Sequence, residues 1–132
     1  MIRIDDTEHP IVTVTFDGDT TDEAFGKYLA DMTSLVLDRR LQTLTILDAR
    51  KATAVSAAQR RAQAVWLRDN ARLLARYSLG TVFVIESSII RGVLTAILWL
   101  QPMPGPHIVV PSLALGRVWA KERIAEALAP AA

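Results

Sequence analysis

Two apolar stretches of the chain, TLTILDAR and TVFVIESS, each end in charged or hydroxyl side chains. In an open α/β sheet, ligands gather at the carboxyl ends of the strands, beside the N-termini of the helices that follow. There an arginine and helix N–H groups could bind an anionic group. Alternatively, the serines cap helices and the charges pair with each other. The candidate rim residues are Asp48, Arg50, Ser56, Glu86, Ser87, Ser88 and Arg91.

Ser87, His107 and Asp48 are the serine, histidine and carboxylate from which a nucleophilic site could be assembled. Such a site requires a base within hydrogen-bonding distance of the nucleophile. His107 begins its expected strand, whereas Ser87 and Asp48 follow theirs, so a parallel sheet would place them at opposite ends. The sequence GTVFVIESSIIRG also lacks the glycine spacing of phosphate-binding loops and dinucleotide-binding motifs. We therefore predict no catalytic residues, and a hydrolase is the least favoured alternative.

Metal and nucleic-acid binding are disfavoured by composition. The chain has no cysteine and two histidines, so it can build neither a thiolate metal site nor a histidine cluster. We expect no metal and no cofactor. The net charge is +1, with five basic and ten acidic residues in 1–50 and ten basic and four acidic residues in 51–132. This balance is weaker than the basic excess of nucleic-acid-binding proteins, and we expect no nucleic-acid partner.

The length and apolar content indicate one soluble domain covering residues 1–132. Apolar residues make up 51% of the 132 and charged residues 22%. The start, MIRIDD, lacks the basic and apolar regions of a signal peptide, and the longest apolar run falls short of the about 20 residues that cross a bilayer. We expect a cytoplasmic protein with no membrane span.

The first half of the chain predicts a hairpin followed by a helix and a third strand. Residues 11–16, IVTVTF, alternate as in a half-buried strand, and MIRI is the expected antiparallel partner. A capping box of Thr20 and Glu23 opens a helix over 21–38. The β-branched run LQTLTILDA then predicts an interior strand that ends at Asp48.

The second half repeats the alternation. Ser56 and Gln59 form a capping box for a helix that runs to about Tyr77, with Ala58, Val65 and Trp66 among its inward residues. A strand follows at 81–85, a helix at 88–100, a strand at 107–111 and a final helix from Ser112 to near Leu128. The order β-β-α-β-α-β-α-β-α, with four helices, predicts a single mixed and mostly parallel sheet of about five strands.

This succession resembles the STAS domain, and more closely its SpoIIAA-like branch, sometimes described as STAS/SEC14. The resemblance rests on the hairpin, TILDAR, GTVFVIESSIIRGVLTAI and the closing VVPS and RVWAKERI, and it covers nearly the whole chain. It implies a non-enzymatic regulatory domain that acts through a protein partner. In phosphorylated STAS antagonists a D-S-S-G-L motif presents a serine to a kinase. Here VSAAQRRA retains only Ser56, which the capping box already explains, and a phosphoserine switch remains an alternative.

The helix expected at 88–100 has more apolar surface than a sheet can cover. Its apolar arc is near 200° wide, whereas a helix on a sheet usually needs about 100°. A neighbouring helix, the same helix of a second copy or a bound apolar ligand could cover the surplus. We favour a homodimer whose surface includes Leu98, Trp99 and Met103, with close approach at Gly92. The SEC14 resemblance keeps a lipid or small apolar ligand as the alternative.

Overall fold

The protein is described here by a computed structural model, which covers residues 1–129. Its centre is a five-stranded sheet in the order β1-β2-β3-β4-β5. Strand β1 (Ile2–Glu8) pairs antiparallel with β2 (Ile11–Gly18). Strands β3 (Thr43–Ala52), β4 (Ser78–Val84) and β5 (His107–Val110) continue the sheet from β2, each parallel to its neighbour. The predicted mixed sheet with an N-terminal hairpin is confirmed.

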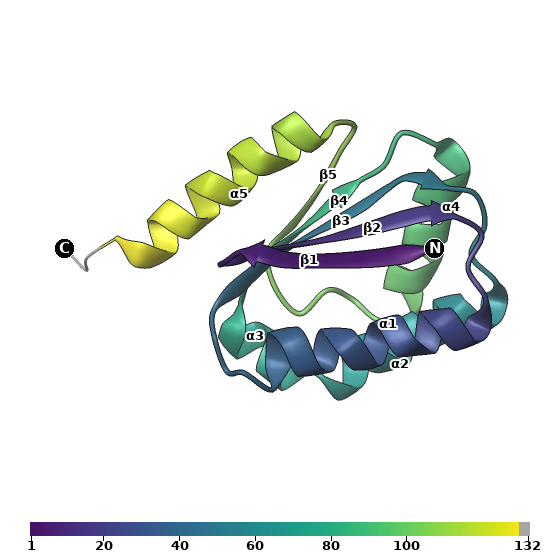
Figure 1. The fold of residues 1–132 in the computed structure, drawn as a ribbon, viewed down its shortest axis with the longest axis horizontal. Helices are drawn as coiled ribbons and strands as arrows, with labels where there is room; N and C mark the ends of the chain where they lie inside the picture. The colour runs from purple at the N-terminus through teal and green to yellow at the C-terminus, as the bar shows by residue number, and fades with distance from the viewer. Residues whose placement is uncertain (130–132) are drawn as a thin grey trace.

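Helices cover both faces of the sheet unequally. Helices α1 (Asp22–Met32), α2 (Ala57–Asp69), α3 (Ala71–Tyr77) and α4 (Ser88–Leu100) lie on one side, which we call the four-helix face, and α5 (Leu113–Leu128) lies on the other, the α5 face (Figure 1). A π-helical segment, η1 (Thr33–Leu37), extends α1. Because successive strands are also neighbours in the sheet, α1 to α4 each lie within a connection between adjacent parallel strands.

Residues 1–129 contain five α-helices rather than the predicted four helices, because the helix expected to run to Tyr77 is divided at Asn70. The side chain of Asn70 donates a hydrogen bond to the carbonyl oxygen of Trp66, at 2.9 Å, and its backbone leaves the helical region. An asparagine amide competes with the backbone ladder in this way. The inward face also differs from the prediction, because Ala64, Leu67 and Leu74 are buried while Ala58 and Val65 are exposed.

The helix caps were predicted with one error. Ser56 and Gln59 form the expected capping box of α2, with both reciprocal hydrogen bonds present. The box expected from Thr20 and Glu23 is wrong, because Thr21 is the N-cap and its hydroxyl accepts from the backbone N–H of Ala24 at 3.1 Å. The register of this cap lies one residue later than the T-x-x-E pattern indicates.

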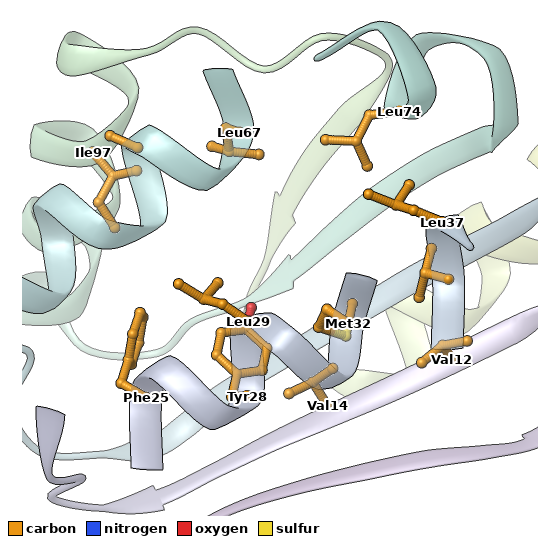
Figure 2. Close-up of a cluster of buried hydrophobic side chains, with 12 residues drawn as sticks. Val12, Val14, Phe25, Tyr28, Leu29, Met32, Leu37, Leu67, Leu74 and Ile97 are labelled. Carbon is orange, nitrogen blue, oxygen red and sulfur yellow. The ribbon is translucent and has the colours of Figure 1, made fainter. Parts of the chain in front are cut away.

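The main core lies between β2 and the helices of the four-helix face. Val14 of β2 lies beside Tyr28 and Met32 of α1, and Val12 lies below η1 (Figure 2). Residues of α2, α3 and α4 complete the cluster. Tyr28 packs edge-on against both Phe16 and Phe25, with ring centroids 5.3 Å apart in each pair. The alternation seen in IVTVTF therefore buries one face of β2, as predicted.

On the α5 face, a glycine allows the helix to approach the sheet closely. A Cβ at Gly116 would lie 2.8 Å from the Cγ1 of Val82 and 3.5 Å from the Cγ2 of Val110. Trp119 and Ile124 of α5 pack on the same cluster, whereas Val118 is exposed. The edge strand β5 has four residues and is flanked by Pro106 and Pro111.

Candidate functional site

A cavity of about 130 Å³ lies between β3 and β4 and the helices of the four-helix face. The loop at 103–106 contributes to its wall. Most of the lining is aliphatic or aromatic. These apolar side chains are Phe16, Phe25, Met32, Val36, Leu47, Trp66, Leu67, Leu74, Phe83, Ile85, Ile90, Val93, Leu94, Ile97, Leu98 and Met103.

The floor of the cavity combines small residues with larger ones. Thr45, Leu47 and Ala49 of β3 alternate along one face of the strand, and Thr81 and Phe83 of β4 lie on the same side. Small side chains in the floor leave space beneath the large side chains of α2 and α4. Protein interiors normally have few voids larger than a water molecule, so a cavity of this size is an unusual feature of the core.

The polar groups in the wall are few, and several already have partners. The Tyr28 hydroxyl donates to the Gln63 side-chain oxygen at 3.2 Å. The Trp66 indole N–H donates to the Thr33 hydroxyl at 2.9 Å. Burial raises the pKa of Tyr28 well above its usual value, so this phenol stays neutral. The cavity therefore has an uncharged wall at neutral pH.

Part of the surplus apolar surface of α4 lines this cavity. Ile90, Leu94 and Ile97 are buried, and α4 also contacts α2. The expectation that Leu98 and Met103 are exposed is wrong, because both are half-buried and line the cavity. Trp99 is 86% exposed, as expected, together with Ile89 and Leu100 on the outer side of the helix. Gly92 is exposed, and among residues 1–129 no atom outside its own helix would touch a Cβ there.

Asp48 and Arg50 lie on the α5 face, away from the cavity. Strand β3 continues to Ala52, so these residues lie within it and not after it as predicted. Arg50 donates to both carboxylate oxygens of Asp48, Nε to Oδ1 at 2.9 Å and Nη2 to Oδ2 at 2.8 Å. These hydrogen bonds hold the pKa of Asp48 below its ordinary value, although its burial acts in the opposite direction. The two side chains hydrogen-bond to each other, which matches the alternative in which the rim charges form pairs.

The other rim residues lie on the loop before α4 and in its first turns. The Ser87 hydroxyl is the N-cap and accepts from the backbone N–H groups of Ile89 and Ile90, at 3.1 and 3.4 Å. Glu86, Ser88 and Arg91 are exposed. Arg91 borders a shallow surface groove with Val109, and that groove contains none of the other rim residues. The structure thus does not bring the predicted rim together around one pocket.

Ser56 belongs to a polar cluster where the N-termini of α1 and α2 meet. Its hydroxyl donates to Oδ1 of Asp22 at 3.0 Å, and the same oxygen accepts from the Gln59 side chain at 2.9 Å. Gln59 is buried and also donates to the carbonyl oxygen of Thr20. A phosphate on Ser56 would face the Asp22 carboxylate, and like-charge repulsion would oppose it. The capping role of Ser56 is thus present, and the phosphoserine switch is the less favoured alternative.

His107 and Ser87 lie at opposite ends of the sheet, as predicted. His107 is the register partner of Thr81, near the start of β4, and its ring meets the edge of Phe83 at 6.3 Å between centroids. Ser87 follows the other end of that strand. In the part of the chain that the structure describes, no group of three histidine or carboxylate side chains is placed to hold a metal ion.

Comparison with known proteins identifies the fold. No family model matches the sequence, and no curated protein matches it. The structure is similar to the crystal structure of an uncharacterized protein of the DUF3478 family from Shewanella loihica PV-4, described as having a SpoIIAA-like fold. The two superimpose with a TM-score of 0.60 and 11% sequence identity, over 90% of this chain and 91% of the other. The chain has a SpoIIAA-like fold.

This SpoIIAA-like fold agrees with the resemblance read from the sequence, whereas an apolar pocket was predicted only as the alternative in which a ligand covers the helix at 88–100. One signal was present in the sequence. In LQTLTIL, Thr43 and Thr45 share a face of a strand that was expected to be fully interior, and both are buried. Hydroxyls at interior positions indicate either internal hydrogen bonds or a cavity. No helix within residues 1–129 is long and apolar enough to span a bilayer.

Proposed function

We propose that the protein binds a small apolar ligand in the cavity between β3–β4 and the helices α1, α2 and α4, and that it acts by binding rather than by catalysis. The observation that carries the proposal is the cavity itself, with its volume of about 130 Å³ and its apolar wall. An apolar cavity of about 150 Å³ stays free of water and takes up benzene or xenon.

The free-energy cost of an empty cavity supports this function. At about 24 cal/mol per Å³ of enclosed void, a cavity of 130 Å³ costs at most about 3 kcal/mol of folding stability, because part of it opens to the surface. Net stabilities of domains are about 5–15 kcal/mol, so this is a substantial fraction. A ligand that fills the space recovers the lost contacts, and it stabilises the fold by an amount that grows with the logarithm of its free concentration above Kd.

The size of the cavity argues for a small ligand rather than a phospholipid. Pockets for drug-sized ligands are about 300–1,000 Å³, well above the volume found here. A diacyl lipid would require α2 and α4 to move away from the sheet. Separation of α2 and α4 would break the contact between these helices and expose Leu67 and Ile97, which are now buried.

Titration with benzene, followed by methyl NMR, tests the proposal. We expect a Kd of about 1 mM or below, with shifts at Leu94 and Ile97 but not at Ile46 on the α5 face. Ala49→Leu should abolish binding because it fills the cavity floor, whereas Ala114→Leu on an exposed position of α5 should leave it unchanged. A wild-type protein whose cavity methyls do not respond to benzene would reject the proposal. Native mass spectrometry that finds a retained phospholipid would contradict the small size.

A second candidate function is a protein interaction through the outer side of α4, with a homodimer as the simplest case. Ile89, Trp99 and Leu100 are 73%, 86% and 64% exposed, and large apolar side chains gathered on one helix are common in interfaces. Gly92, open to solvent in this chain, lies on the same helix and would permit a second backbone to approach.

Sedimentation measures whether this surface forms a dimer. We expect a parent of twice 14.5 kDa and a Trp99→Glu variant of 14.5 kDa. Leu128→Glu, at an exposed position near the end of α5, is the matched control and should sediment as the parent does. A parent of 14.5 kDa at high concentration would reject the homodimer.

A further inference from the structure

Two threonine hydroxyls in the cavity floor have no hydrogen-bond partner among residues 1–129. Thr45 and Thr81 both line the cavity and are each 8% exposed. Within residues 1–129, neither hydroxyl takes part in a hydrogen bond. By contrast, the other polar side chains of the wall are engaged, since Tyr28 donates to Gln63 and the Ser78 hydroxyl donates to the carbonyl oxygen of Gly80 at 3.4 Å.

The two hydroxyls lie side by side. Thr45 of β3 and Thr81 of β4 are register partners in the parallel ladder, so their side chains leave the same face of the sheet at neighbouring positions. Adjacent strands are about 4.8 Å apart, which lets one ligand atom contact both hydroxyls. Thr43, two residues before Thr45, is also buried and its hydroxyl is unpartnered.

These positions give the floor a direction. Its amino-terminal half carries the threonines, and the carboxyl-terminal half carries Leu47, Ala49, Phe83 and Ile85. Valine has the shape of threonine and would satisfy the packing without a buried hydroxyl. An unpaired hydroxyl in an apolar cavity costs free energy that a polar ligand group can recover.

We propose that Thr45 and Thr81 bind the single polar, uncharged group of an otherwise apolar ligand, whose apolar body points toward Leu47 and Ile85. This inference rests on the proposed function and adds the chemical class of the ligand. Of the described residues that line the wall, none is acidic or basic, so a charged ligand group would be buried without a partner. Threonine hydroxyls both donate and accept, so an alcohol, a phenol or a carbonyl group fits.

Phenol and toluene are nearly equal in size and test the inference directly, because phenol replaces a methyl group with a hydroxyl. Phenol is neutral at pH 7, since its pKa is about 10. We expect Thr45→Val with Thr81→Val to weaken phenol binding about tenfold or more and to leave toluene binding unchanged or stronger. Thr45→Ser with Thr81→Ser should keep the phenol affinity. Thr13→Val, in β2 and outside the cavity lining, is the matched control and should change neither affinity.

The outcomes separate the two proposals. If the wild-type protein binds neither phenol nor toluene, the cavity is not a binding site and the proposed function fails. If it binds both, and the double valine variant changes their affinities by the same factor, the cavity binds ligands but the threonines do not recognise a polar group. A preference for phenol that the serine variant keeps and the valine variant loses supports the inference.

Discussion

The two faces of the sheet are packed in opposite ways. On the α5 face a single helix lies so close that a Cβ at Gly116 would clash with Val82, and Leu44, Ile46 and Val84 beneath it are fully buried. On the four-helix face, more helices cover the sheet and yet a cavity remains. The amount of cover therefore does not decide how well a face is packed. What decides it is the fit between side chains, with a small residue at the helix contact on the α5 face and a floor of mixed small and large residues under the helices of the four-helix face.

The two faces should differ most in the free energy of unfolding that is lost when one large side chain on each face is truncated to alanine. We expect Ile46→Ala to lower the free energy of unfolding by about 4 kcal/mol, because its fully buried neighbours cannot close the space. Leu94→Ala, beside the existing cavity, should cost about 2 kcal/mol because this side chain already has fewer contacts. Urea unfolding measures both values. Equal costs would contradict the difference in packing.

Replacing a glycine by alanine should change the stability in opposite directions on the two faces. Gly116→Ala places a Cβ 2.8 Å from Val82, and we expect it to destabilise the fold by about 1–2 kcal/mol. Gly92→Ala, in the exposed part of α4 with open space around it, should stabilise the protein by about 0.5–1 kcal/mol through helix propensity. Thermal unfolding of the two variants and the parent is the measurement, and a stabilised Gly116→Ala would show that α5 can move away.

A smaller effect on the free energy of unfolding is expected at the Asp48–Arg50 ion pair of β3. Since the pKa of Asp48 is lowered in the folded state, the pair stabilises the protein above the ordinary aspartate pKa of about 3.9, and this contribution is lost as the pH falls below that value. Arg50→Gln should lower the free energy of unfolding by only about 1 kcal/mol at pH 7, because Arg50 is about one-third exposed. Near pH 2 the loss should be much smaller, because Asp48 is then protonated and no longer pairs with Arg50.

Unfolding of the parent and of Arg50→Gln across pH 2–7 provides the check. Arg68→Gln is the control, because its partner Asp69 is also exposed and the pair should contribute little at any pH. If the difference between the parent and Arg50→Gln did not depend on pH, Asp48 would not be the group that Arg50 stabilises.

Local patterns in the sequence were enough to predict the order of the elements. The alternation in IVTVTF, the Ser56–Gln59 capping box and the apolar runs that become β3 and β4 each depend on neighbouring residues. The ends of the strands were harder to predict where pairing with a neighbouring strand decides them. Strand β3 extends past Ala49 because Lys51 and Ala52 pair with Asp17 and Gly18 of β2, and the sequence of 50–52 does not itself indicate a strand.

The candidate site was harder to predict because a cavity depends on the spacing of elements. Leu98 and Met103 were assigned to an outer surface, since their apolar character alone does not tell which side of the helix and loop faces the sheet. The rim residues were placed near the correct end of the strands. Their side chains, however, cap helices, pair with each other or face solvent, which only the three-dimensional arrangement determines.

The brevity of β5 affects how copies of this protein can associate. Its free side offers few backbone groups, and the prolines at both of its ends cannot donate to an added strand. At the opposite margin, β1 carries Arg3, Asp5, Asp6 and Glu8, whose charges discourage a like strand from docking. Growth into cross-β aggregates is thus opposed at both margins, and self-association, where it occurs, is directed to helical surfaces.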